Sequence, residues 1–171
     1  NDPKTIDAVY YVTAHEMGHY LFGAYHIYGT SNLALMAGGP AWNACRGMCS
    51  WEKQKLGWLN YTDISTNANA TLSDYMSTGC AYRVLVSGPS SSEYFLVENR
   101  QRDVNKNGIN LTSKLGGQIQ IFHLEKDTTK FRWYGADSIK GVITDVDEFD
   151  WANPGNGIVI WHVDENIINA N

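Results

Sequence analysis

The sequence has few cysteines, no long apolar run and no excess of positive charge. Its 171 residues include three cysteines, and an odd number leaves one thiol free or paired outside this segment. No apolar run approaches the roughly 20 residues that span a bilayer. Thirteen basic residues against 18 acidic ones give a net charge of −5. This balance argues against nucleic acid or an anionic membrane surface as the main partner. Composition alone thus indicates a globular protein.

The pairing of the cysteines stays open. Cys45 and Cys49 could close a small loop, and Cys80 could pair with either of them. Their spacing fits no four-ligand structural zinc site.

The chain also lacks an initiator methionine and a signal peptide, so we expect a mature or excised piece of something longer. Three N-x-T acceptor sequences begin at Asn60, Asn69 and Asn110, in polar surroundings. Asparagine in this context accepts glycans on exported proteins. The three sites together predict a secreted glycoprotein.

The most informative stretch is His15-Glu16-Met17-Gly18-His19, an H-E-x-x-H motif. Residues four apart on an α-helix lie one turn apart on one face, so both imidazoles can reach a single metal ion. Glu16 is then placed to act as the base for a water that the metal activates. Apolar residues at mixed spacings of three and four predict a helix from about residue 5 to 21 or 22.

A catalytic zinc site needs a third protein ligand. In a continuous helix His26 would lie about 10 Å beyond His19, so the chain has to break and turn back, and Gly23 permits such a break. The metzincin pattern H-E-x-x-H-x-x-G-x-x-H has the same glycine-to-histidine spacing, but Gly23 and His26 each lie one residue further from His19. We predict His26 as the third ligand, with Glu52 as the alternative. Met36 follows at the spacing of a methionine turn, as apolar support for the histidines.

The fold class predicted is α+β, with the motif helix followed by a mostly antiparallel β region. Residues 1–60 would form the lower part of a catalytic domain, and residues 61–171 a β-rich region that continues it or packs on it. A short helix is expected over 50–57, beginning at Ser50 as N-cap. Strands are expected over 82–87 and 93–99 as a hairpin, over 118–124, and over 157–163 as a central strand because it is nearly all apolar.

The chain resembles the immune-inhibitor-A-like secreted metallopeptidases in several segments beyond the zinc motif. These occur in family order and read LMAGG at 35–39, SWEKQKLGWL at 50–59, YFLVENR at 94–100 and GIVIWHVDE at 157–165. The resemblance implies an exported, zinc-dependent endopeptidase that acts on proteins, often with bound calcium. It also implies a sheet-containing subdomain before the motif helix. Only 14 residues precede His15, so we expect that upper subdomain to be missing here, and a preceding segment or another chain to complete the cleft.

Two acidic stretches are candidate calcium sites. Asp103, Asn105 and Asn107 have the oxygen-ligand spacing of a calcium loop, but Lys114 stands where an EF-hand needs glutamate. An ordinary Asn- and Asp-rich turn is the alternative. The second stretch contains carboxylates that repel one another unless they are solvated or bridged by a cation, namely Asp145, Asp147, Glu148 and Asp150.

The leading hypothesis is therefore a secreted metalloprotease that hydrolyses peptide bonds with Zn²⁺, and Ca²⁺ as a second candidate cofactor. Zinc would be held by His15, His19 and His26, with Glu16 as general base. The alternative is a non-catalytic structural or adhesive module of a secreted assembly that retains the peptidase fold. A purely structural zinc site has no use for a base at Glu16.

Overall fold

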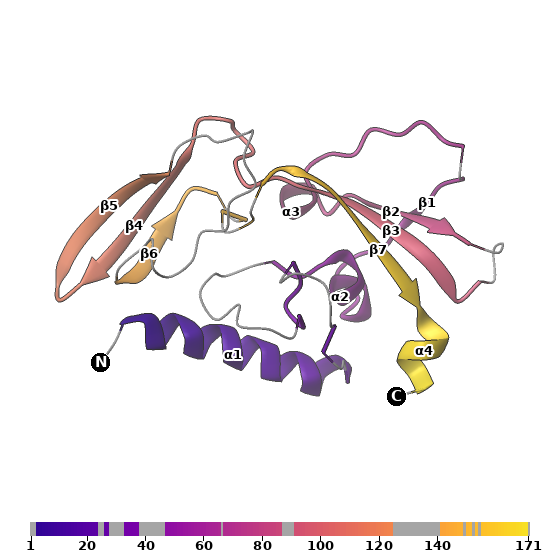
Figure 1. Cartoon of the computed structure of the whole chain (residues 1–171), viewed down its shortest axis with the longest axis horizontal. Coiled ribbons are helices and arrows are strands. Elements are labelled where there is room, and N and C mark those ends of the chain that lie inside the picture. Colours follow the sequence, from indigo (N-terminus) through magenta and orange to yellow (C-terminus); the bar gives the residue numbers. More distant parts are fainter. Residues whose placement is uncertain are drawn as a thin grey trace.

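The computed structural model describes residues 3–23, 26–27, 33–37, 47–65, 67–86, 91–124, 141–148, 150–151, 153 and 155–170. The motif helix α1 (Pro3–Phe22) runs along one side of the molecule, and the two sheets lie on the other side (Figure 1). The short helix α2 (Ser50–Lys55) lies between α1 and the larger sheet. Both helices were predicted, and the structure confirms them.

The start of α2 differs by one residue from the prediction. Cys49, not Ser50, is the N-cap, and its backbone N–H donates to Glu52 Oε2 at 2.7 Å. Glutamate three residues after the N-cap can reach back in this way and satisfy a backbone donor at the helix start. Glu52 is therefore drawn inward at the first turn of α2 and is fully buried.

The larger sheet has the strand order β1-β2-β3-β7. Its strands are β1 (Thr62–Asp63), β2 (Ala81–Leu85), β3 (Glu93–Arg100) and β7 (Gly157–Asp164). The short helix α3 (Tyr75–Thr78) precedes β2, and α4 (Glu165–Ala170) follows β7. β1 pairs with β2 in parallel and the other pairs are antiparallel. The β2–β3 pairing confirms the predicted hairpin.

The prediction that residues 157–163 form a central strand is wrong. β7 pairs with β3 alone in the sheet of described strands and is an edge strand. Trp161 and Val163 point into the core, whereas Ile158 and Ile160 on the opposite face are 56% and 63% exposed. The apolar run alternates between buried and exposed positions, which is the pattern of a strand covered on one face only.

The smaller sheet has the order β5-β4-β6 and is antiparallel throughout. It consists of β4 (Ile109–Leu115), β5 (Gln118–Leu124) and β6 (Val142–Val146). The strand predicted over 118–124 is thus confirmed. β6 contacts α1, and this sheet lies over the N-terminal half of that helix (Figure 1). The mixed, mostly antiparallel α+β class predicted from the sequence is what the structure has.

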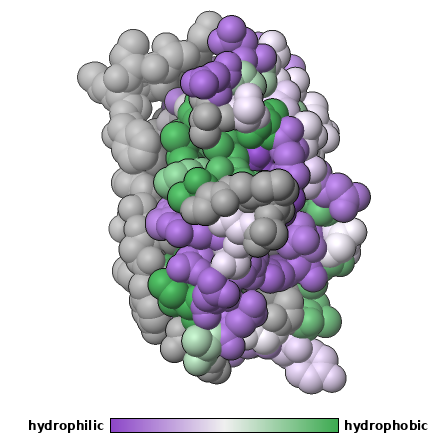
Figure 2. Space-filling view, turned by 90° about the vertical axis from the view of Figure 1, so that its right-hand side faces the viewer, coloured by the Kyte–Doolittle hydropathy of each residue, from purple (hydrophilic) through white to green (hydrophobic). Residues whose placement is uncertain are grey.

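The largest core cluster joins the loop after α1, helix α2 and the larger sheet. It includes the buried side chains of Met36, Trp51, Leu96 and Trp161. Residues from 1–60 and from 61–171 therefore share one core cluster. The end of the molecule with the larger sheet and α4 is largely polar, and apolar residues emerge there in patches (Figure 2). In the part of the chain that the structure describes, no helix is long and apolar enough to span a bilayer.

Candidate metal centre

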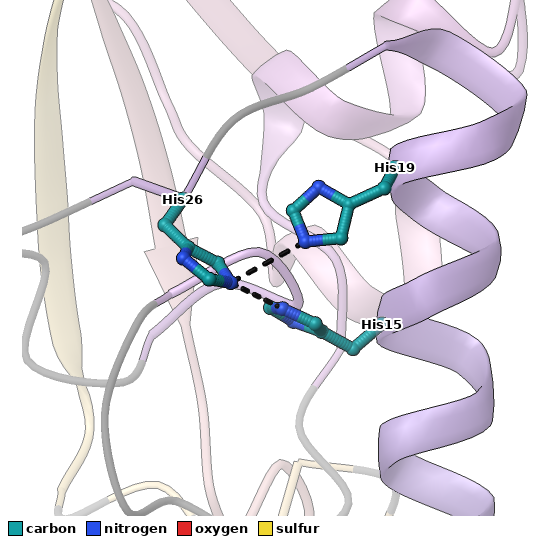
Figure 3. Close-up of side chains that lie close together, drawn as sticks. All are labelled: His15, His19 and His26. Atoms are coloured by element: carbon teal, nitrogen blue, oxygen red, sulfur yellow. Dashed lines mark hydrogen bonds between the residues drawn. The ribbon is translucent and has the colours of Figure 1, made fainter.

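Three histidine side chains converge at the C-terminal end of α1. His26 Nε2 lies 2.8 Å from His15 Nε2 and 3.3 Å from His19 Nε2. The three ring centroids are each 4.9 Å apart, so the rings form a nearly equilateral triangle. His15 and His19 project from one face of the helix, and His26 reaches them from the following loop (Figure 3). Among the described residues this is the group of three that could hold a metal ion.

The chain turns back toward the helix at Gly23. α1 ends at Phe22, and Gly23 has a φ of +60°, in the left-handed region that glycine adopts without strain. The metzincin pattern places its glycine three residues after the second histidine, and here one more helical residue, Phe22, comes first. This residue absorbs the one-residue shift, because His26 still reaches the two helical histidines.

Hydrogen bonding fixes the tautomer of His15. Its Nδ1 lies 2.8 Å from the backbone carbonyl oxygen of Leu35, in a buried position. A carbonyl oxygen only accepts, so Nδ1 carries the hydrogen, and Nε2 of the neutral ring keeps a lone pair directed at the other histidines. Metal-ligating histidines commonly donate their second ring nitrogen to a carbonyl or carboxylate in this way.

The arrangement fits a metal ion better than it fits hydrogen bonds among the histidines. A neutral His26 has one N–H at most and can donate from Nε2 to only one of its two neighbours, whereas a cation accepts lone pairs from all three nitrogens. Two nitrogens held at about 2.0–2.1 Å by one tetrahedral zinc lie roughly 3.3 Å apart. The distance from His19 to His26 matches this value, and the distance from His15 to His26 is somewhat shorter.

The site is open on one side. His15 is buried, His19 is half-buried and His26 is exposed. Glu16, the next residue along the helix from His15, is exposed as well. Three protein ligands with an accessible fourth position distinguish catalytic zinc sites from closed structural ones.

Met36 lies in the core at the turn formed by residues 33–37. It is completely buried, in the cluster that also contains Trp51 and Leu96. Its backbone carbonyl oxygen accepts a hydrogen bond from the N–H of Ile27, the residue after His26, at 2.8 Å. The turn predicted as apolar support is therefore hydrogen-bonded to the residue that follows the third histidine.

Glu52, the alternative third ligand, is not in the histidine group. Its carboxylate accepts hydrogen bonds from three backbone N–H groups, those of Leu35, Met36 and Cys49. Burial raises the pKa of Glu52, and these hydrogen bonds oppose the rise. Sequence inspection missed this role. The signal that was present is glutamate at the third position of α2, which the capping rule directs to the N-cap backbone.

The calcium candidates are given other partners by the structure. The carboxylate of Asp103 accepts from the backbone N–H groups of Asn107 and Gly108 and so closes a turn rich in Asn and Asp, the alternative named from the sequence. Asp147 accepts from the backbone and side chain of Asn110. Within the described ranges, no group of three acidic residues comes close enough to hold a cation. Calcium at Asp103, Asn105, Asn107, Asp145, Asp147 or Asp150 stays a prediction.

The predicted glycan acceptors lie at the surface, and Cys49 lies in the core. The predicted glycan acceptors Asn60, Asn69 and Asn110 are all exposed. Cys49 and Cys80 are free thiols, and burial raises the pKa of Cys49 well above its usual range. Cys45 lies outside the described residues.

No family model, no curated protein and no solved structure matches this chain. The resemblance to immune-inhibitor-A-like peptidases therefore stays a prediction from the residues and their order.

Proposed function

We propose that the protein is a secreted zinc endopeptidase, with zinc held by His15, His19 and His26. The observation that carries the proposal is the convergence of three imidazole nitrogens, two of them 2.8 Å and 3.3 Å from the third. Imidazole suits zinc, and three histidines with an open position are a known catalytic set. Glu16 beside His15 adds a carboxylate that a structural zinc site would not need.

His15, His19 and His26 would hold the zinc, which would supply Lewis-acid chemistry toward water and the carbonyl of the scissile bond. Glu16 supplies the proton transfers. Its carboxylate accepts a proton from the attacking water and delivers it to the nitrogen of the leaving amine. Its exposure leaves it within reach of water and of a bound peptide. The Nδ1–H of His15 donates to the carbonyl oxygen of Leu35, and this hydrogen bond holds the imidazole ring in one orientation.

The test separates metal binding from hydrolysis. Wild-type protein and Glu16→Ala are loaded with zinc, and metal content and cleavage of casein are measured with and without a chelator. We expect both proteins to bind one zinc, and only wild type to cleave casein in a way that the chelator stops and zinc restores. Equal cleavage by the Glu16→Ala variant would overturn the assignment of Glu16.

The same experiment tests the alternative of a non-catalytic module. Zinc bound at one equivalent without turnover of casein or of other unfolded proteins would favour that module. Failure of zinc to bind wild-type protein would remove the metal site and the peptidase proposal together.

A further inference from the structure

Glu52 is a fully buried carboxylate that forms no ion pair within the described residues, and it binds backbone N–H groups from two separate segments. Oε1 accepts from Met36 N at 2.6 Å, and Oε2 accepts from Leu35 N at 3.1 Å and from Cys49 N at 2.7 Å. Burying a carboxylate is costly unless its oxygens are hydrogen-bonded. Three backbone donors compensate for this cost at the start of α2 and at the turn of residues 33–37.

Carbonyl groups of the same turn bind His15 and the backbone of the residue after His26. The carbonyl oxygen of Leu35 accepts from His15 Nδ1 at 2.8 Å. The carbonyl oxygen of Met36 accepts from the N–H of Ile27, which follows His26, at 2.8 Å. Leu35 and Met36 thus each donate a backbone N–H to Glu52. Their carbonyl oxygens accept from His15 and from the backbone beside His26. A displacement of the turn would move His15 and His26 together.

We propose that Glu52 is a positioning residue of the metal centre, which acts by fixing the turn of Leu35 and Met36 against α2. The inference rests on the proposed metal site and explains how the third histidine is held in place. Glu52 does not coordinate the metal. It sets the positions of the carbonyl oxygens that orient the ring of His15 and the backbone beside His26.

A carboxylate meets the needs of this position and a carboxamide does not. Both carboxylate oxygens accept, and the three N–H groups are divided between them. Glutamine has nearly the same shape, but its amide nitrogen would face either the Met36 N–H or the Leu35 and Cys49 N–H groups, donor against donor. At least one hydrogen bond to the turn or to the helix is lost in Glu52→Gln.

The experiment compares Glu52→Gln with Glu165→Gln as a matched control. Glu165 also anchors α2, since it accepts from Trp51 Nε1 and Lys55 Nζ, but its carboxylate bonds to residues outside the turn of residues 33–37. Zinc affinity is measured by competition with a chelating dye, and the visible spectrum of the Co²⁺-loaded protein reports on ligand geometry. Circular dichroism and thermal unfolding show whether each variant is folded.

We expect Glu52→Gln to lower zinc affinity by about 10–100-fold, the usual effect of removing a group that orients a ligand. Its Co²⁺ spectrum should shift, and Glu165→Gln should keep the wild-type affinity and spectrum. Wild-type affinity and spectrum in a folded Glu52→Gln variant would overturn the proposal, as would an equal loss in Glu165→Gln. Weak zinc binding by wild type itself would instead overturn the proposed function, so the two failures are distinguishable.

Amide hydrogen exchange in wild-type protein gives a second test if Glu52→Gln does not fold. Coupling between two sites is reciprocal, so a turn that positions the ligands is itself stabilised when metal binds. Zinc should slow exchange at the N–H groups of Leu35, Met36 and Cys49. The N–H of Ser77, which donates to Asp74 in a separate helix cap, serves as the control and should be unaffected. Unchanged exchange at all three N–H groups would overturn the proposal.

Discussion

Arg100 and Asp150 form a two-point ion pair in the core. Arg100 Nε lies 2.6 Å from Asp150 Oδ2, and Nη2 lies 2.9 Å from Oδ1. The same guanidinium donates to Glu98 and, through Nη1, to the backbone carbonyl oxygen of Leu33 at 3.2 Å. This ion pair therefore connects the larger sheet to the start of the turn that faces the histidines.

Removal of Asp150 should destabilise the fold strongly. Asp150→Ala leaves the guanidinium of Arg100 buried with Glu98 as its remaining anionic partner, and breaking a buried pair typically costs about 3–5 kcal/mol. Because Glu98 still offsets the charge, we expect a loss of about 3 kcal/mol. Urea unfolding measures it.

The control is the bidentate pair of Arg83 and Asp63, whose aspartate side chain is 54% exposed. Asp63→Ala should cost less than about 1 kcal/mol because solvent screens the pair. Equal losses in the two variants would contradict the distinction between buried and exposed pairs.

His26 should contribute to zinc affinity far more than another exposed histidine. His26→Ala removes one of three ligands, so we expect affinity to fall by on the order of a hundredfold or more. His123→Ala is the control, since His123 is exposed on β5 and its Nδ1 lies 2.8 Å from Asn110 Oδ1. Zinc titration against a chelating dye gives both values. An unchanged affinity in His26→Ala would show that two histidines and another group bind the metal.

The left-handed conformation of Gly23 should matter for the site beyond its effect on stability. Gly23→Ala places a Cβ in open space, but at a φ of +60° it costs about 1–2 kcal/mol. Gly116→Ala, in the turn between β4 and β5, has the same open surroundings at a φ of +56°. We expect similar losses of unfolding free energy and a lower zinc affinity only in Gly23→Ala. Affinity loss in both variants would indicate a general effect of destabilisation.

The carboxylate of Glu165 should make stability depend on pH in the acidic range. Burial opposes its charge, but hydrogen bonds from Lys55, Tyr94 and Trp51 outweigh burial and lower its pKa below the usual 4.5. A carboxylate whose pKa is lower in the folded state stabilises the fold above its unfolded pKa, and this stabilisation is lost as the pH falls through the folded value.

Unfolding free energies of wild type and Glu165→Gln, measured from about pH 6 down to about pH 3, test this expectation. Wild type should be the more stable protein at the upper end, and the difference should shrink toward the lower end. A constant difference across the range would contradict a contribution from the ionised carboxylate.

The sequence by itself determined the local geometry of this protein. The four-residue spacing of His15 and His19 places them on one helix face, because the helical repeat is set by backbone sterics. Gly23 determined where the helix could end, and the β2–β3 hairpin and β5 followed from alternation and turn residues. These features depend on neighbours in the chain, so they could be inferred without long-range contacts.

The tertiary structure alone decided which distant groups meet. His26 could be proposed as a ligand, but its approach to His15 depends on the turn around Met36, which is 10 residues further along. The capping rule could direct Glu52 to the N–H of Cys49, but the hydrogen bonds from Leu35 and Met36 depend on how the turn packs against α2. β7 could not be placed at the sheet edge, because an apolar run does not specify its neighbours. Spacing fixes which side chains share a face, whereas packing fixes what that face meets.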